Sequence, residues 1–293
     1  MMEYLKAIIL GIVQGATEFL PVSSSGHLSV FQHFMGLSGE GSLQLTVFLH
    51  IGALVAVIAV YYKTFWKLIK EIGKTIGEFF TRKLDTKHVS DDRHMLYMMF
   101  ISCIPLLFLF IPVGGGQNLK DLVEGLANDT DILVEGFCFL ITAILLFTGS
   151  RASRTKKNIR PMVEGKDAWW VGVAQLTAAA FPGISRSGST ISTGMLRGVD
   201  KDYMVEYSFV LGTPAVLAAA VLEIKDTLEG GALALGIGPI LVGIVVSAVV
   251  GVAAIKLLEW LVNKDKFQFF GYYCLILSAV VITLATLEKL GIL

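Results

Sequence analysis

Charged residues are scarce in this chain. Only 16% of its 293 residues are Asp, Glu, Lys or Arg, whereas 54% are hydrophobic. A soluble domain of this length carries about a quarter charged residues, so the composition excludes a soluble globular protein and places most of the chain in lipid. The formal net charge is zero, so the basic field of a nucleic-acid-binding protein is lacking as well.

Cysteines and leader signals are equally sparse. The three cysteines, Cys103, Cys138 and Cys274, lie singly within apolar runs. They show neither metal-ligand spacing nor a disulfide pattern, and we interpret them as packing residues. Segment 1–20 has no basic region before its apolar stretch and carries Gln14 and Glu18, whereas a signal peptide is smoothly apolar there. We therefore expect this segment to be retained.

Long apolar runs, by contrast, are abundant. A transmembrane helix needs about 20 largely apolar residues. Two apolar regions, 3–36 and 169–198, are interrupted by Pro21 and Pro182. The expected fold is an all-α polytopic membrane protein: six transmembrane helices and two re-entrant helical hairpins in a single membrane domain. The six predicted spans are 43–62, 95–113, 132–149, 203–223, 238–257 and 268–288.

Positive charge is distributed unevenly among the connecting segments. Lys and Arg gather in 63–94, 150–168 and 256–267, whereas acidic residues prevail in 114–131 and 224–238. Cytoplasmic loops carry the excess of basic residues, so the first three segments are predicted to be cytoplasmic and the last two extracytoplasmic. Both termini then lie outside, and the two hairpins enter from opposite faces, the first one opening to the extracytoplasmic side.

A shift of 161 positions superimposes the two broken regions. It places Gly11 on Gly172, Gln14 on Gln175, Pro21 on Pro182, Ser24 on Ser185 and Phe48 on Phe209. Chance identities are common in apolar chains, so the coincidence of the two helix breaks is the informative one. We predict an inverted-topology repeat with halves 1–150 and 162–293, whose broken helices meet near the midplane and form the site.

The first break carries a cluster of polar residues. Gln14 and Glu18 are four residues apart and share one helix face, and an ionisable residue inside a membrane segment indicates function. Pro21 ends that helix, and the serines that follow supply cap oxygens for a second helix whose free N–H groups suit an anion. If Ser24 and His27 both lie in its first turn, their side chains fall on one side. Interhelical hydrogen bonding by Glu18 and capping by the serines are the alternative, purely structural interpretations.

The second break reads Phe-Pro-Gly-Ile-Ser-Arg-Ser-Gly-Ser-Thr over 181–190. The guanidinium of Arg186 offers a planar fork that matches phosphate oxygens, and Gly183 and Gly188 allow the backbone to approach a ligand. The alternative is an arginine that merely snorkels to the membrane edge. The candidate substrate-binding residues of the two breaks are Ser25, Gly26, Ser185, Arg186, Ser187, Gly188 and Thr190.

Together these motifs closely resemble those of the bacterial undecaprenyl-diphosphate phosphatases of the bacitracin-resistance type. The resemblance covers the Gln14–Glu18 run, the Pro-Val-Ser-Ser-Ser-Gly-His stretch from Pro21 and the Ser-Arg-Ser-Gly stretch from Ser185, and extends over the whole chain. Two positions depart from the family pattern: Gln14 stands where the family often has an acid, and Ile184 where it often has threonine. With Gln14, the first motif retains a single carboxylate.

The resemblance implies a phosphatase of the bacterial plasma membrane that recycles the lipid carrier for cell-wall synthesis and confers bacitracin resistance. In that reading Arg186, Ser185 and Thr190 hold the diphosphate, and Glu18 with Gln14 holds a divalent cation, Mg²⁺ or Ca²⁺. Ser24 is the nucleophile and His27 the base; His27 as the phosphorylated nucleophile is the alternative. The expected partners are the polyprenyl diphosphate and membrane lipid but no nucleic acid, and a homodimer is left open.

Two further interpretations concern residues beside the motifs. Segment 63–83 alternates apolar and basic residues, and Trp66, Ile69, Ile76 and Phe80 share one helical face, which indicates an interfacial helix on anionic lipid. His50 lies inside a predicted span and is a candidate for lining the site. A secondary transporter or lipid flippase is the rival function, since inverted repeats and broken helices are also transporter architecture. The Glu18, Ser24 and His27 cluster favours the enzyme.

Overall fold

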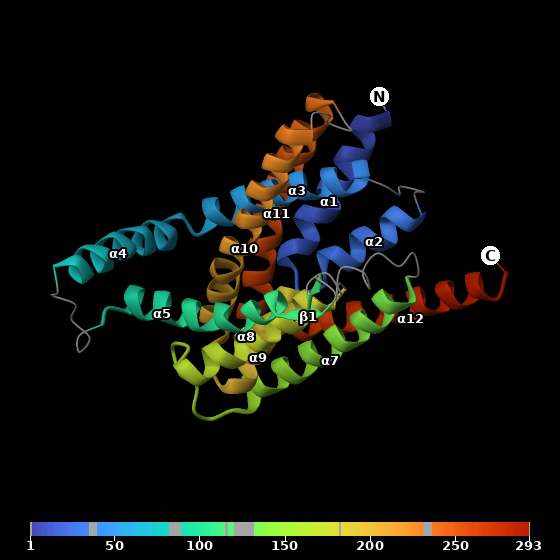
Figure 1. Ribbon diagram of the computed structural model, residues 1–293. Coiled ribbons are helices and arrows are strands. Elements are labelled where there is room, and N and C mark those ends of the chain that lie inside the picture. The colour runs from blue at the N-terminus through green and yellow to red at the C-terminus, as the bar shows by residue number, and fades with distance from the viewer. Residues whose placement is uncertain are drawn as a thin grey trace.

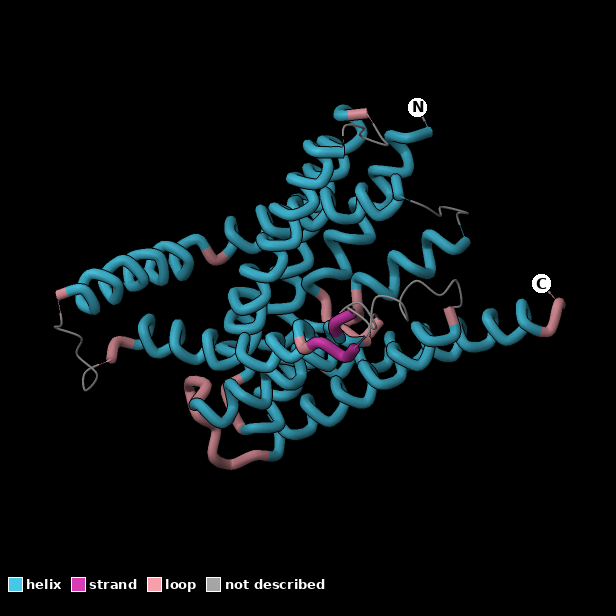
Figure 2. Tube along the Cα trace, viewed as in Figure 1, coloured by secondary structure: helices cyan, strands magenta, loops and turns pink. Residues whose placement is uncertain are grey.

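The computed structural model consists almost entirely of helices (Figure 1; Figure 2). It describes residues 2–34, 40–81, 89–114, 117–119, 132–181, 183–230 and 236–292. In chain order the elements are α1 (Met2–Phe19), α2 (Ser24–Phe34), α3 (Glu40–Val60), α4 (Tyr62–Phe80), α5 (Asp91–Cys103), the 3-10 helix η1 (Ile104–Phe110), β1 (Pro112–Gly114), β2 (Gln117–Asn118), α7 (Leu133–Thr155), α8 (Gly165–Ala180), α9 (Arg186–Arg197), α10 (Lys201–Gly230), α11 (Ile237–Asn263) and α12 (Gln268–Lys289).

The six predicted spans all coincide with helical structure. Among the described residues, four helical segments are long and apolar enough to cross a membrane, and a fifth results when the bent pair α3 and α4 counts as one span. The chain therefore has the helices of a multi-pass membrane protein. The predicted spans correspond, in order, to α3, α5 with η1, α7, α10, α11 and α12.

The predicted span 95–113 is not one uniform helix. Its α-helical part, α5, ends at Cys103, and the chain continues as the 3-10 helix η1, which has Pro105 in its first turn. Proline has no N–H for the α-helical hydrogen bond and clashes with the preceding turn. Ile111 is extended because it precedes Pro112, and the short antiparallel ribbon of β1 and β2 follows, a departure from the expected all-α fold.

The first broken region folds as two helices, as predicted. The helix α1 ends at Phe19, and α2 begins at Ser24, because the backbone before Pro21 disfavours helical geometry. Ser23 has a φ of 73° and turns the chain. Its Oγ accepts a hydrogen bond from the N–H of Gly26 at 3.2 Å, so Ser23 caps α2.

The second broken region has the same plan. Helix α8 ends at Ala180, and Gly183 has a φ of 107°, a conformation that favours glycine. Ser185 is the N-cap of α9, and its Oγ accepts a hydrogen bond from the N–H of Gly188 at 3.0 Å. The predicted break at Pro182 lies outside the described residues.

Close helix packing holds the bundle together. Helix α1 packs along α11, and α12 lies beside α7 (Figure 1). A Cβ on Gly11 would lie 2.8 Å from the carbonyl oxygen of Gly243 on α11, and one on Gly172 would lie 2.9 Å from Cδ of Pro105. Between helices in lipid there is no hydrophobic driving force, so small residues that allow close approach contribute the packing energy.

Candidate functional site

The two helix breaks meet inside the bundle. The N–H of Gly183 donates a hydrogen bond to Ser25 Oγ at 3.2 Å, although the two residues are 158 positions apart. A Cβ on Gly188 would lie 3.2 Å from the carbonyl oxygen of Pro21. The first turn of each helix, α2 and α9, therefore contacts the break that precedes the other helix.

An ion pair links the two breaks. Nη2 of Arg186, at the start of α9, donates to Oε1 of Glu18 on α1 at 2.6 Å. The side chain of Glu18 is only 8% exposed and that of Arg186 is 25% exposed. A buried carboxylate needs such partners. The meeting of the two breaks predicts a carboxylate, a serine and an imidazole near the guanidinium. The Glu18 carboxylate is there, with Ser24 hydrogen-bonded to it, whereas the imidazole of His27 is directed elsewhere.

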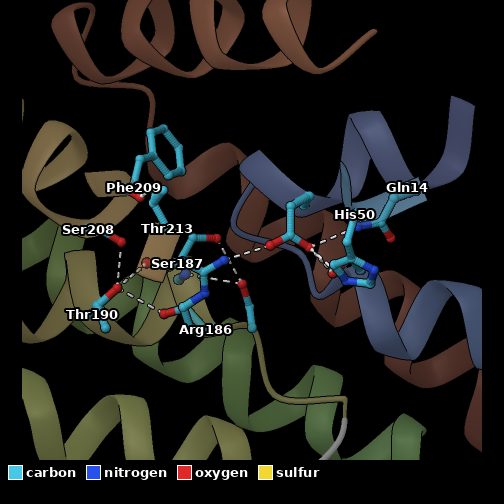
Figure 3. A network of polar contacts seen from close by, with 12 residues as sticks. Gln14, His50, Arg186, Ser187, Thr190, Ser208, Phe209 and Thr213 are labelled. Atoms are coloured by element: carbon cyan, nitrogen blue, oxygen red, sulfur yellow. Dashed lines mark hydrogen bonds and ion pairs between the residues drawn. The ribbon is translucent and has the colours of Figure 1, made fainter. Parts of the chain in front are cut away.

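The second oxygen of Glu18 gathers further polar groups. Oε2 accepts hydrogen bonds from Ser24 Oγ at 2.7 Å and from Gln14 Nε2 at 3.1 Å. Nε2 of His50 lies 3.7 Å from the same oxygen, while its Nδ1 donates to the carbonyl oxygen of Thr46 at 2.8 Å. Figure 3 shows this network, with Gln14 and His50 on one side and Arg186 on the other. The sequence offered His50 only as a candidate for lining the site, and the structure places it beside Glu18.

Two cavities of opposite character share Glu18 and Arg186. The first is lined by serines from both helix N-termini: Ser23, Ser24, Ser25, Ser185 and Ser187. The second lies between α3 and α10 and is lined chiefly by apolar side chains: Phe19, Ala53, Leu54, Val57, Phe209 and Val216. A molecule with an anionic head and an apolar tail matches this pair of cavities, because helix N-termini favour anions.

The other predicted substrate-binding residues have separate tasks. Ser187 lines the polar cavity. The hydroxyl of Thr190 is engaged with Ser208 Oγ at 2.6 Å and with the carbonyl oxygen of Arg186 at 2.9 Å. Gly26 serves packing, since a Cβ there would lie 2.8 Å from Cζ of Phe139. The structure therefore brings Ser24, Ser25, Ser185, Arg186 and Ser187 to the polar cavity and directs Thr190 and Gly26 to the surrounding helices.

The sequence predicted that His27 and Ser24 lie on one side of α2, but the side chain of His27 points away from Ser24. Its Nδ1 donates to the carbonyl oxygen of Ser23 at 2.7 Å, and its Nε2 lies 2.7 Å from the hydroxyl of Tyr273 on α12. The ring stacks on Tyr273 and meets Phe139 edge-on. Ser24 is the first residue of α2 and faces back to Glu18, whereas His27 lies three residues further along and faces the aromatic pair.

Gly212 on α10 fixes the place of the guanidinium. A Cβ on Gly212 would occupy the space of Arg186 Nη1 and lie 3.0 Å from Nη2. Gly212 and its neighbour Thr213 also line the apolar cavity. Sequence reasoning missed both residues. The available signal was a glycine inside an apolar helix, which indicates close approach by another group.

A buried ion-pair cluster supports the other end of α9. Asp167 near the start of α8 is fully buried and lies 2.6 Å from Nη1 of Arg160 and 2.9 Å from Nε of Arg197. Burial alone would raise the pKa of this carboxyl, but the hydrogen bonds from Arg160, the backbone of Glu164 and Arg197 outweigh it and lower the pKa. The cluster thus ties α8 to the last turn of α9 and holds the hairpin closed.

The oxygen ligands near Glu18 are too few to hold a hard cation without further ligands from substrate or water. Within the described ranges, no group of three or more His, Cys, Asp or Glu side chains converges. Gln14 is fully buried, and its Oε1 has no hydrogen-bond partner among the described residues. The amide nitrogen of Gln14, not this oxygen, faces the Glu18 carboxylate. With the amide turned over, Gln14 and Glu18 would hold a cation that completes its shell with phosphate oxygens and water, as hard cations do.

Comparison with known proteins gives concordant matches. The family model described as bacitracin resistance protein BacA matches residues 7–280. An undecaprenyl-diphosphatase of Alkaliphilus metalliredigens is 37% identical over 98% of this chain and 100% of its own length. Proteins of the same name from Halothermothrix orenii and Methanosphaera stadtmanae are 36% and 37% identical, each over 97% of this chain and 99% of its own length.

Proposed function

Since the chain belongs to the bacitracin resistance protein BacA family, we propose that its Glu18–Arg186 site carries out the undecaprenyl-diphosphatase reaction for which its relatives are named. The protein is a membrane phosphatase that converts undecaprenyl diphosphate to undecaprenyl phosphate and phosphate, and the family name implies bacitracin resistance. The observation that carries the assignment to this site is the meeting of Ser24, Glu18 and Arg186 beside a polar and an apolar cavity that both have Glu18 and Arg186 in their linings.

The polar cavity receives the diphosphate and the apolar cavity the first prenyl units. Arg186 exchanges Glu18 for phosphate oxygens, and the N-termini of α2 and α9 add their partial positive charge. Both features stabilise the charge that spreads over the phosphoryl group during transfer. The hydroxyls of Ser25, Ser185 and Ser187 complete the lining.

Ser24 is the nucleophile in this proposal. Its Oγ attacks the terminal phosphorus, the bond from that phosphorus to the bridging oxygen breaks, and undecaprenyl phosphate leaves. Water then hydrolyses the phosphoserine and releases phosphate. Two observations favour Ser24 over His27: Ser24 lines the polar cavity, and both ring nitrogens of His27 are engaged elsewhere.

The proton of Ser24 passes to Glu18, whose Oε2 is 2.7 Å from Ser24 Oγ. A general base must lie within hydrogen-bond reach of the proton it takes, and Glu18 does. In place of the base role expected for His27, we assign this histidine to fixing the start of α2 against Tyr273 on α12. His50, 3.7 Å from Glu18, helps to keep the carboxylate in place.

Glu18 and Gln14 would hold a divalent cation, Mg²⁺ or Ca²⁺, jointly with the substrate. Such an ion would neutralise charge on the diphosphate. Gln14 would supply its Oε1, which has no hydrogen-bond partner among the described residues, after its amide turns over, and Gln14→Glu adds a second carboxylate. We expect that variant to reach half-maximal activity at a lower Mg²⁺ concentration than the wild type after chelation, and Gln14→Leu to require a higher one.

The full topology proposed is six transmembrane helices with two opposed re-entrant hairpins, α1 with α2 and α8 with α9. Support comes from the contact of the two breaks and from Gly11 and Gly172, which serve the same packing role 161 positions apart. The charge pattern of the connecting segments places both termini and the mouth of the site on the extracytoplasmic face. Reporter fusions after Met1 and Leu293 test this, and a cytoplasmic signal from both would reverse the direction.

The function is tested by phosphate released from undecaprenyl diphosphate by the purified protein. We expect Ser24→Ala and Arg186→Ala each to lower kcat by about 10³-fold or more. Ser29→Ala is the matched control, because Ser29 also donates a 2.7 Å hydrogen bond to a glutamate, Glu135, from the same helix. Wild-type rates in both site variants would refute the site, and lipid transfer across vesicles without phosphate release would support the flippase instead.

A further inference from the structure

Helix α4 presents a surface that the site does not use. It bends by 86° from α3 at Tyr61 and extends away from the bundle beside α5 (Figure 1). A helix that turns this far from α3, one of the proposed spans, does not continue that span in the same direction.

One side of α4 is apolar and open. Trp66, Ile69, Ile76, Phe79 and Phe80 form this α4 apolar face, and between 52% and 79% of each residue is exposed. Leu68, on another side of the helix, is buried. Contiguous exposed apolar surface of this kind marks a membrane or protein contact.

The acidic residues of α4 are directed away from that face. Its only two acids, Glu71 and Glu78, pair with Arg93 of α5 at 2.5 Å and 2.8 Å, and the side chain of Arg93 is only 3% exposed. The negative charge of α4 is therefore compensated inside the α4–α5 contact, and what α4 presents outwards is positive.

Four lysines supply that positive charge. Lys63, Lys67, Lys70 and Lys74 recur at intervals of three or four residues, so they form one row along the helix, and all four are exposed. Lys67 and Lys74 lie 3.9 Å from Asp92 and Glu78, but their side chains are 63% and 61% exposed, and such surface pairs contribute little. Lys70 Nζ lies 5.1 Å from the ring centroid of Trp66 and Lys63 Nζ 5.9 Å from that of Tyr62.

We propose that α4 binds an anionic phospholipid surface, with the α4 apolar face in the acyl boundary and the lysine row on the headgroup phosphates. An apolar face beside a purely basic row is the arrangement of interfacial helices. Tyrosine and tryptophan rings also prefer the membrane–water interface, and on α4 the rings of Tyr62 and Trp66 lie against the ammonium groups of Lys63 and Lys70. Charge complementarity therefore selects acidic lipid over a neutral surface.

Trp66 is a built-in probe of this contact. Replacing the other three tryptophans, Trp169, Trp170 and Trp260, by phenylalanine leaves it as the only one. The full-length protein is placed in phosphatidylcholine nanodiscs that contain equal fractions of brominated phosphatidylglycerol or brominated phosphatidylcholine. We expect stronger quenching of Trp66 by the anionic lipid, and a preference that falls by up to about fivefold for each lysine changed to glutamine.

The matched control removes the same charge from other connecting segments. Lys156, Lys157, Lys166 and Lys264 are also exposed, and their change to glutamine should leave the quenching ratio unaltered. Phosphate release in detergent should persist in the lysine-row variant, which shows that it folds. Equal quenching by both lipids, or ready quenching of Trp66 by aqueous iodide, would overturn the proposal; the latter would indicate a face left open for a soluble protein partner.

Discussion

Gly212 provides the sharpest test of how the Arg186 guanidinium is held. The change Gly212→Ala places a methyl group where Nη1 of Arg186 lies. Both cannot occupy that space, so either α10 retreats or the guanidinium leaves Glu18. Helix α10 is packed against α3 and α9, and the side chain is the more mobile of the two, so the guanidinium is expected to move.

The expected loss follows from what the guanidinium does. Removing one preorganised donor from a developing oxyanion costs about 10²- to 10³-fold in kcat, and we expect a loss of that size for Gly212→Ala in the phosphate-release assay. The double variant Gly212→Ala/Arg186→Ala should be no slower than Arg186→Ala alone, because both changes act through the same group. Thermal stability should fall in the single variant, because the displaced guanidinium leaves the buried Glu18 carboxylate without its ion-pair partner. The preference for alanine over glycine within a helix, about 0.5–1 kcal/mol, offsets only part of this loss.

Gly73→Ala is the control for the substitution itself. Gly73 lies within a helix, α4, and a Cβ there meets nothing within 4 Å, so activity should equal that of the wild type. The reasoning is refuted if Gly212→Ala keeps wild-type kcat, or if the losses of the two single variants multiply in the double variant.

Three further predictions concern the tail cavity, the hairpin and the histidine. Leu54→Trp should raise KM for undecaprenyl diphosphate about tenfold by filling the apolar cavity, whereas Val55→Trp, at an exposed neighbour, should leave KM unchanged. Asp167→Asn should lower stability at pH 7 by about 2 kcal/mol, the size of a hydrogen bond to a charged group. Because the pKa of Asp167 is lowered from its ordinary 3.8, the wild-type advantage in Tm should be full above about pH 4 and shrink as the pH falls further. His27→Gln should lower Tm yet keep kcat within about tenfold; an unchanged Tm with a 10³-fold loss of kcat would make His27 the base.

The architecture was largely predictable because its signals are local. Apolar runs of sufficient length predicted six spans; the structure has helices at these places, and among its described residues four or five are long and apolar enough to cross a membrane. Pro21 and the serines after it marked the first helix break, where α1 in fact ends at Phe19. The proximity of Glu18 and Arg186 followed from the assumption that the two broken regions meet. The η1 segment was overlooked, although Pro105 is visible in the sequence.

The rest of the site depends on contacts that sequence spacing does not encode. The orientation of His27 is decided by Tyr273, which is 246 residues away. Gly212 matters only because Arg186 reaches across to α10. The serines likewise have different roles: Ser23 and Ser185 cap helices, whereas Ser24 donates a hydrogen bond to the Glu18 carboxylate. These roles depend on which residue begins each helix.

The Glu18–Arg186 pair has a thermodynamic consequence for product release. In the ligand-free protein the guanidinium already has an anionic partner, so any phosphate must compete with Glu18 and binds more weakly than it would to an unpaired arginine. In the proposed binding mode, undecaprenyl diphosphate would compensate through contacts of its tail with Leu54, Val57 and Phe209, which line the apolar cavity. Free phosphate has no tail, so Glu18 competes with it for Arg186 more successfully. Re-formation of the ion pair therefore favours phosphate release at the end of each turnover.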